Sequence, residues 1–249
     1  MKELVRRLVR SLGYDIRRLP SSRSDPGAIP DAGYYDPLFS PWLGYGAFGP
    51  LLEHVRPRTL VSADRIFVLY SLARQAIALG GEIWECGVYR GGSAGLLAET
   101  IAASCKPGTT PGTPRLRLFD SFAGMKETDA KRDLHQPGDF SDTSLESVRA
   151  FVGHSEFVSI HPGWIPDTFA GLEESRIALA HVDVDLYRSV LDSARFILPR
   201  MLAGGFVLFD DYGFPSCPGA RQAVDEFFAD RPERPLVLPT GQALVFVSR

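Results

Sequence analysis

The sequence predicts an α/β fold, with a doubly wound, mostly parallel sheet of seven strands and a C-terminal antiparallel hairpin. Short apolar runs alternate with helical patterns between residues 83 and 228, and such alternation is typical of parallel sheets covered by helices. The strand runs are apolar throughout, as expected for strands buried on both faces. A chain of 249 residues with 45% hydrophobic and 23% charged residues is long enough for one sizeable core.

The individual elements follow from these patterns in chain order. Apolar residues at helical spacing predict an amphipathic helix over residues 63–79. Strands are expected over 83–86, 116–120, 157–161, 176–184 and 205–210, and the closing hairpin over 236–238 and 243–247. The helices between them are expected over 93–104, 144–151, 187–198 and 219–228. Ser144 is the expected N-cap of one of these helices, and Pro199 ends the next.

Residues 51–249 are expected to form this domain, and residues 1–50 an accessory part. Residues 1–19 place Leu and Val at helical spacing opposite a cationic face, which predicts a helix packed on its own domain or on a second subunit. Contact with an anionic membrane surface is the alternative. Residues 20–50 combine Pro, Gly and Ser with many aromatic rings, which is typical of a segment that covers an active site rather than of a flexible linker.

Composition narrows the class of partner and the cell compartment. The net charge of -3 provides no general basic field, so nucleic acid is not an expected partner. Membrane contact is not expected either, because no apolar stretch reaches the ~20 residues that span a bilayer. The widely spaced Cys86, Cys105 and Cys217 argue against a zinc knuckle or a disulfide scaffold. They suit a reducing cytoplasm.

Two acidic clusters carry most of the functional information. Asp183-Val184-Asp185 and Asp210-Asp211 each follow a buried-strand pattern. If the two strands are neighbours, their ends lie roughly 5 Å apart, and carboxylates gathered there repel one another unless they are protonated or share a cation. Oxygen ligands favour Mg²⁺ over Zn²⁺. The alternative is that these aspartates are ordinary turn and strand-end residues.

The end of the first strand predicts a cofactor. The run Glu85-Cys86-Gly87 is followed by Gly91-Gly92, and glycines there let a ligand approach the backbone. The G-x-G-x-x-G pattern of a dinucleotide site is missing, and Glu85 would repel a pyrophosphate but suit an ammonium or sulfonium group. Asp120 ends the second strand, where an acid can accept both hydroxyl protons of a ribose. S-adenosylmethionine satisfies both acids; an NAD-dependent oxidoreductase and a non-catalytic binding protein are the rival hypotheses.

Several stretches then occur in one order: Glu85–Gly92, Phe119–Met125, Gly163–Thr168, Asp183–Tyr187 and Phe209–Tyr212. Together they resemble the macrocin O-methyltransferase family, Mg²⁺-dependent enzymes that methylate hydroxyls on sugars and other parts of natural products. The resemblance covers residues 55–249. It implies a Rossmann-like class I methyltransferase that uses S-adenosylmethionine, is cytosolic and usually oligomeric, and acts on a glycosylated small molecule. A phenol or catechol acceptor stays open.

The resemblance also assigns residues. It implies Asp183, Asp210 and Asp211 as metal ligands, and Asp185 as general base. His135, on the loop after the second strand, is a second candidate base. The expected cofactor contacts are Thr59, Leu60, Glu85, Gly87, Val88, Tyr89, Ser93, Asp120, Ser121, Phe122, Gly163 and Trp164. The other histidines, His54, His154, His161 and His181, are interpreted as structural or surface residues. Val184 departs from the family, in which a small or polar residue usually stands between these aspartates.

Overall fold

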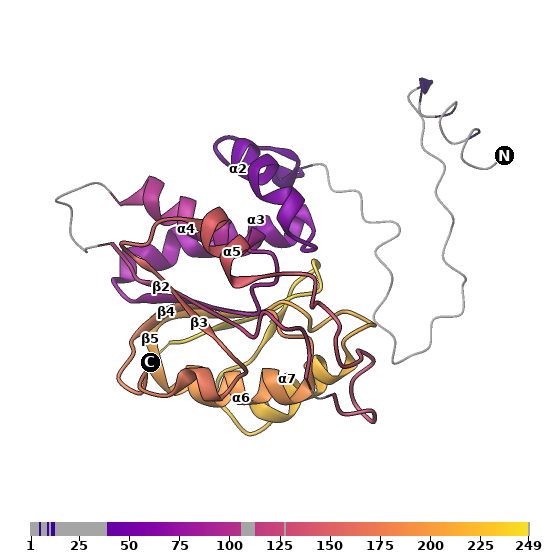
Figure 1. The fold of residues 1–249 in the computed structure, drawn as a ribbon, viewed down its shortest axis with the longest axis vertical. Coiled ribbons are helices and arrows are strands. Elements are labelled where there is room, and N and C mark those ends of the chain that lie inside the picture. The colour runs from indigo at the N-terminus through magenta and orange to yellow at the C-terminus, as the bar shows by residue number, and fades with distance from the viewer. Residues whose placement is uncertain are drawn as a thin grey trace. The chain divides into compact units, whose positions relative to one another are not determined.

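The structure, a computed structural model, confirms the predicted α/β class (Figure 1). It describes residues 39–105, 113–126 and 128–248, together with Val5, Val9, Ser11 and Leu12. The sheet belongs to a compact unit that runs from Pro41 to Arg249. Apart from those four residues, the accessory helix expected in residues 1–19 lies outside the described residues, and so does most of the cover segment expected in residues 20–50.

One seven-stranded sheet has the order β3-β2-β1-β4-β5-β7-β6. Strands β1 to β5 are parallel, whereas β7 runs antiparallel to both β5 and β6, so the predicted terminal hairpin is confirmed. The bounds are β1 Glu82–Cys86, β2 Leu116–Asp120, β3 Val158–Pro162, β4 Ile177–Val182, β5 Met201–Phe209, β6 Leu236–Val237 and β7 Ala243–Phe246. The strand order reverses between β1 and β4, and α/β proteins bind ligands at such a switch point.

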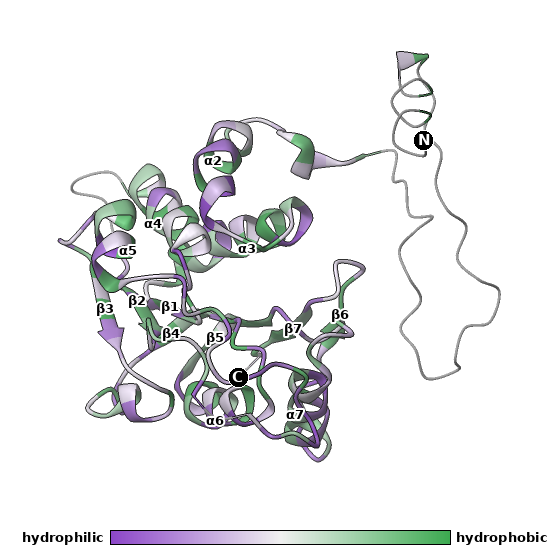
Figure 2. Cartoon of the chain, turned by 45° about the vertical axis from the view of Figure 1, so that its right-hand side comes forward, coloured by the Kyte–Doolittle hydropathy of each residue, from purple (hydrophilic) through white to green (hydrophobic). Residues whose placement is uncertain are grey.

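Helices cover both faces of this sheet. In Figures 1 and 2, α2, α3, α4 and α5 lie on one face and α6 and α7 on the other, and each helix carries both hydrophobic and hydrophilic residues. The bounds are α2 Phe48–Val55, α3 Ala63–Ala76, α4 Gly92–Ser104, α5 Leu145–Val152, α6 Tyr187–Ile197 and α7 Pro218–Phe228. Short 3-10 turns are η1 Pro41–Leu43, η2 Arg56–Arg58, η3 Ile77–Leu79, η4 Asp167–Phe169 and η5 Leu198–Arg200. Ser144 caps α5 as predicted, its side chain accepting a hydrogen bond from Ser147 N at 3.2 Å.

The core consists of two apolar clusters separated by the sheet. Successive strand residues point to opposite faces, so Ile83 packs beneath α3 and α4 while its neighbour Trp84 packs on the other side. There Trp84 contacts Phe119, with 4.7 Å between ring centroids. Because both faces are buried, the strands read as continuous apolar runs, which made them recognisable in the sequence.

The segment before α3 differs from the prediction. Residues 20–50 were expected to form a segment that covers the active site, but α2 begins at Phe48 and buries Phe48, Leu52 and Val55 in the core. The boundary expected at residue 50 therefore falls inside a packed helix. The short helix was missed because its two turns are preceded by glycines and aromatic residues that mask the apolar spacing.

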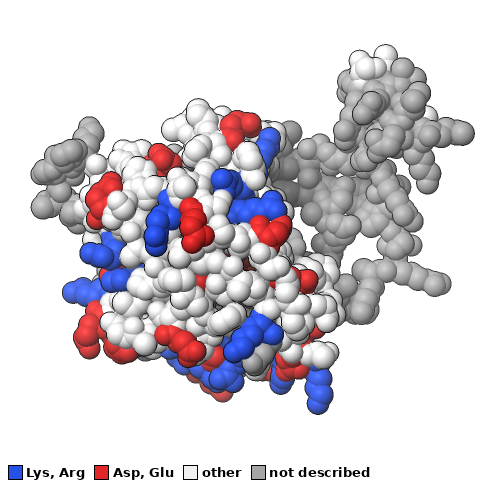
Figure 3. Space-filling model, in the orientation of Figure 1, with Lys and Arg blue, Asp and Glu red and all other residues white. Residues whose placement is uncertain are grey.

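On the face shown in Figure 3, acidic and basic residues are interspersed and neither sign forms a continuous area. Within the described part of the chain, no helix has the length and apolar character needed to cross a bilayer.

Gly87 fixes the relation between the turn after β1 and the end of β4. Its φ is 86°, and a Cβ built on it would lie 1.7 Å from the carbonyl oxygen of Asp183. Backbone therefore passes directly over backbone at this point, which only glycine allows. The cofactor turn and the first acidic cluster are thus in direct contact.

We expect Gly87→Ala to lower the free energy of unfolding by at least about 2 kcal/mol more than Gly171→Ala, because overpacking adds to the cost of the left-handed backbone. Gly171 is a matched control, since its φ is 81° and a Cβ there would have nothing within 4 Å. Urea unfolding of both variants measures the difference. Equal losses would show that the close approach to Asp183 is not a constraint.

Candidate active site

A cavity of about 740 Å³ opens at the carboxyl ends of the parallel strands. Its walls come from the segments that follow β1, β2, β3, β4 and β5, and from the chain between α2 and α3. All predicted site residues line it except Glu85, Phe122 and Asp210. Most of the residues predicted for the site therefore lie at one cavity.

Asp120 organises the turn after β1. Its Oδ2 accepts hydrogen bonds from Val88 N at 2.7 Å and Tyr89 N at 2.9 Å, and its Oδ1 accepts one from Phe122 N at 2.7 Å. The carboxylate thus ties the end of β2 to the glycine turn, in addition to the ribose contact expected for it. Both lone pairs of Oδ2 are used in this way, and Oδ1 retains one for a hydroxyl donor from the cavity.

The remaining predicted cofactor contacts surround this carboxylate. Gly163 N donates to the carbonyl of Asp120 at 2.8 Å, and Ser93 is buried in the first turn of α4. Trp164 is 44% exposed at the cavity wall, with the Lys126 ammonium 5.2 Å from its ring centroid. The other lining residues among the predicted contacts are Thr59, Leu60, Gly87, Val88, Tyr89 and Ser121.

Glu85 and Phe122 do not line the cavity, which corrects their predicted role as direct cofactor contacts. The register pairs Glu85 with His181 across β1 and β4. Glu85 is fully buried there, and its Oε1 lies 3.0 Å from His181 Nδ1. Its Oε2 has no hydrogen-bond partner among the described residues. Phe122 instead packs against the core on the α4 side of the sheet.

The two acidic clusters lie on neighbouring strands, as the sequence argument required. Val182 pairs with Phe209 at the ends of β4 and β5, and Asp210 N donates to the carbonyl of Val182 at 2.9 Å. Asp183 and Asp210 therefore occupy adjacent positions just beyond the last pair of the ladder. Parallel strands leave carboxylates at such positions no room to separate.

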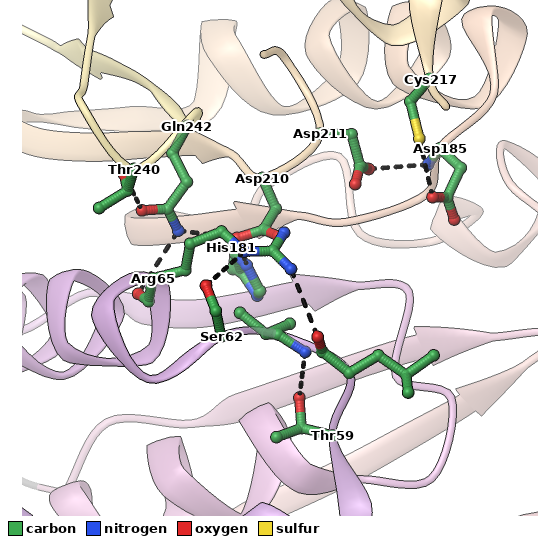
Figure 4. A network of polar contacts seen from close by, with 12 residues as sticks. Thr59, Ser62, Arg65, His181, Asp185, Asp210, Asp211, Cys217, Thr240 and Gln242 are labelled. Atoms are coloured by element: carbon green, nitrogen blue, oxygen red, sulfur yellow. Dashed lines mark hydrogen bonds and ion pairs between the residues drawn. The ribbon is translucent and has the colours of Figure 1, made fainter. Parts of the chain in front are cut away.

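Asp210 is completely buried and surrounded by donors (Figure 4). Its Oδ1 accepts from Gln242 Nε2 at 2.7 Å and lies 3.3 Å from His181 Nε2, while its Oδ2 is ion-paired with Arg65. Burial would raise the pKa of Asp210, but the hydrogen bond from His181 and the charge of Arg65 outweigh burial and lower the pKa. Asp210 is therefore an ionised carboxylate held by two cations and an amide.

His181 was interpreted as structural or surface, and the structure places it between two acids instead of at the surface. Burial would lower the pKa of His181, but hydrogen bonds to Asp210 and Glu85 raise it to about 10. The ring is therefore protonated at neutral pH and donates from both nitrogens. It cannot serve as a metal ligand in that state, even though its ligand atom lies within 4.8 Å of those of Asp183 and Asp210.

The environments of Asp183 and Asp211 shift their pKa values in the direction opposite to that of Asp210. Burial, followed by the nearby charge of Asp210, raises the pKa of Asp183 well above its usual value. Burial and the charges of Asp185 and Asp183 do the same to Asp211. Asp211 Oδ2 accepts from Asp185 N at 2.9 Å, but no cation is paired with either carboxylate among the described residues. The charges of His181 and Arg65 oppose this rise at Asp183 without cancelling it. Buried carboxylates that have no ion-pair partner suit a hard divalent cation.

A second group of polar side chains lies beside Asp185. Cys217 Sγ is 3.3 Å from Asp185 Oδ1, and His135 Nε2 is 3.6 Å from the same oxygen. On its other side, His135 Nδ1 is 3.1 Å from Asp139 Oδ2. Burial raises the pKa of both Asp185 and the Cys217 thiol. The ligand atoms of His135, Asp185 and Cys217 lie within 4.8 Å of one another. The group places Asp185 and His135, the two predicted bases, side by side.

Sequence reasoning missed the residues that support these acids: Arg65, Asp139, His181, Cys217 and Gln242. For one of them, His181, the sequence spacing gave a signal that could have indicated its place in the site. His181 precedes Asp183 by two positions in a buried strand, so both side chains point to the same side of the sheet. Gln242 and Arg65 gave none, because they reach Asp210 from segments far away in the chain.

Comparison with known proteins places this site in a family. Residues 56–237 match the family Macrocin-O-methyltransferase (TylF). The chain is 33% identical over 182 residues to the 8-demethyl-8-(2,3-dimethoxy-alpha-L-rhamnosyl)-tetracenomycin-C 4'-O-methyltransferase of Streptomyces olivaceus, covering 68% of this chain and 67% of that protein. It is 30% identical over 184 residues to the mycinamicin III 3''-O-methyltransferase of Micromonospora griseorubida, covering 68% and 69%. The solved structure of the O-methyltransferase NovP matches with a TM-score of 0.66 and 26% identity, over 77% of this chain and 83% of NovP.

The doubly wound sheet, the glycine turn after β1 and the acid after β2 define an S-adenosylmethionine-dependent methyltransferase. The chain belongs to the Macrocin-O-methyltransferase (TylF) family and is an O-methyltransferase. The predicted family, fold and reaction class are confirmed. The oxidoreductase and the non-catalytic binding protein are thereby excluded.

Removing the charge of Asp210 and removing that of Asp211 should change the stability of the metal-free protein in opposite directions. At neutral pH in excess chelator, we expect Asp210→Asn to cost about 3 kcal/mol, because Arg65 and His181 lose their buried counter-charge. We expect Asp211→Asn to raise the melting temperature, because it removes one of several like charges and keeps an oxygen to accept from Asp185 N.

The pH dependence of the stabilisation by Asp211→Asn follows from the raised pKa of Asp211. The folded protein holds its proton more tightly than the unfolded chain, so ionised Asp211 destabilises the fold as pH rises through the folded pKa. The benefit of Asp211→Asn should therefore be present at pH 8 and vanish toward pH 4. Thermal scans at both pH values measure it. Changes of the same sign in the two variants would contradict the electrostatic assignment.

Proposed function

We propose that this enzyme is a Mg²⁺- and S-adenosylmethionine-dependent O-methyltransferase that acts on a sugar hydroxyl of a glycosylated natural product. The observation that carries the proposal is the adjacent placement of Asp183, Asp210 and Asp211. Asp183 and Asp211 line the cavity, and neither has an ion-pair partner among the described residues. The relatives from Streptomyces olivaceus and Micromonospora griseorubida, whose names specify a rhamnosyl 4'-position and a mycinamicin 3''-position, support a sugar acceptor.

The cavity divides into a donor side and an acceptor side. We assign the donor side to the turn after β1 and to Asp120, whose oxygens face the expected position of the ribose. The acceptor side lies beyond Asp183 and Asp211, where Asp185 and His135 line the wall. Phe140, Tyr187 and Phe214 line the cavity as well, and flat apolar rings of this kind can pack against the face of a sugar.

The metal site is assigned to the oxygens of Asp183, Asp211 and Asp210. When bound, Mg²⁺ lowers the pKa of an alcohol and fixes the position of its oxygen, and S-adenosylmethionine supplies an electrophilic methyl group. Asp210 is already neutralised by its own partners, so Asp183 and Asp211 are the residues that need the ion most. Their fixed positions on adjacent strands orient the acceptor, which by itself contributes several kcal/mol to catalysis.

Asp185 is the proposed general base. It follows Asp183 by two residues, its φ is 55°, and its side chain is 19% exposed toward the cavity. Its raised pKa makes it a better proton acceptor than an ordinary aspartate. His135 would accept the proton in its place if Asp185 is not the base, because its Nε2 faces the same oxygen and Asp139 holds its other nitrogen. A cytoplasmic homo-oligomer remains a prediction from the family resemblance.

A methyl-transfer screen with Mg²⁺ across rhamnosylated and phenolic acceptors tests the substrate class. With the best acceptor, we expect Asp183→Asn to lower kcat by about 100-fold or more while binding of S-adenosylhomocysteine stays nearly unchanged. Excess chelator should abolish wild-type turnover, and added Mg²⁺ should restore it. Full wild-type activity in chelator would overturn the metal assignment.

The base is tested by Asp185→Asn, which should lower kcat by roughly 100-fold to 10,000-fold without weakening Mg²⁺ binding in calorimetry. Asp230→Asn is a matched control, because Asp230 is exposed and does not line the cavity. An unchanged rate in Asp185→Asn together with a large loss in His135→Gln would move the base role to His135.

A further inference from the structure

Arg65 is a buried cation inside the proposed metal site that the reaction does not explain. It lies near the start of α3, is only 9% exposed, and lines the cavity. Its Nη1 is ion-paired with Asp210 Oδ2 (Figure 4). A guanidinium is therefore present on an oxygen that the proposed function assigns to Mg²⁺.

The two carboxylate oxygens of Asp210 have different partners. Oδ1 is shared by Gln242 Nε2 at 2.7 Å and His181 Nε2 at 3.3 Å, whereas Arg65 is the partner of Oδ2 among the described residues. Oδ1 thus anchors the carboxylate on β4 and on the turn before β7. Oδ2 is therefore the oxygen at which a metal ion could replace Arg65 while Gln242 and His181 still hold Oδ1.

Arg65 has other partners that would remain if it released Asp210. Its Cζ lies 4.3 Å from the ring centroid of Phe214, and its Nε is 3.3 Å from Ser62 Oγ. Phe214 lines the cavity, so the planar guanidinium can stay on an aromatic surface while it moves off the carboxylate. In Figure 4, Asp211 and Asp185 lie together with Cys217, apart from this group.

We propose that Arg65 is a positioning residue that acts as the internal counter-ion of Asp210 in the metal-free enzyme and competes with the divalent cation for it, thereby setting the affinity for the ion. This inference rests on the metal role proposed above for Asp183, Asp210 and Asp211. A positive charge a few Å from a divalent ion weakens its binding strongly in a buried site. Its removal should therefore tighten binding, whereas loss of a merely structural residue should weaken binding or leave it unchanged.

Titration of the metal-free enzyme with MgCl₂ in a calorimeter tests this directly, without turnover. We expect Arg65→Met to lower the Kd for Mg²⁺ by about tenfold or more, and Arg65→Lys, which keeps the charge, to stay near wild type. Arg74→Met is a matched control, because Arg74 lies on the same helix, is exposed and packs on Tyr70 away from the site.

Stability gives a second readout on the same proteins. In chelator, Arg65→Met should melt at a lower temperature than wild type, because Asp210 loses a buried counter-charge. Saturating Mg²⁺ should then raise the melting temperature of Arg65→Met by more than it raises that of wild type. If the methionine variant does not fold, Arg65→Gln removes only the charge and keeps a donor for Asp210. The same tightening is then expected.

The outcomes separate this inference from the function on which it rests. If wild type binds Mg²⁺ and neither Arg65→Met nor Arg65→Gln binds it more tightly, Arg65 is not a competitor and only the inference fails. If wild type shows no Mg²⁺ binding and retains full activity in chelator, the metal role itself fails, and the inference fails with it.

Discussion

Burial of several carboxylates at the ends of two adjacent parallel strands is the constraint on which the site depends. Strand spacing brings Asp183 and Asp210 together whatever their charge, and the protein interior gives little screening. Each acid therefore needs a cation, a proton or a dense set of donors. Asp210 is ion-paired with two cations and accepts from an amide, whereas among the described residues no ion pair is formed by Asp183 or Asp211. This unequal distribution separates the structural acid from the acids available to a ligand.

Two of the partners of Asp210 come from elements other than β4 and β5. Arg65 comes from α3 on one face of the sheet, and Gln242 from the turn between β6 and β7. The antiparallel hairpin is therefore part of the site, because it brings an amide to the buried side of Asp210. His181 continues the chain of contacts from Asp210 to Glu85 under the cofactor turn. Through these contacts Asp210 and Glu85 belong to one buried network.

Family membership indicates the reaction. The cavity shows how the turn after β1 and the acidic residues lie relative to one another. The turn after β1 lies directly on the backbone of Asp183, so the donor side and the acidic cluster cannot shift independently. On the acceptor side, Asp185 and His135 are held by Asp211, Cys217 and Asp139 rather than left mobile. In the proposed function, a base and a metal site fixed at one edge of the sheet would keep the acceptor aligned with the donor.

The sequence by itself determined the strands, the helices between them, the two acidic clusters and the glycine turn. These are local features, since buried parallel strands are apolar throughout and the functional residues follow them directly. Only the tertiary structure decided the ionisation of these acids. The Arg65–Asp210 pair joins residues 145 positions apart, and Gln242 reaches Arg65 across 177 positions. Such contacts depend on how helices pack on the sheet, and no local pattern records them. The same reason turned Glu85 from an expected cofactor contact into a buried partner of His181, because its direction was set by strand register rather than by its place in a motif.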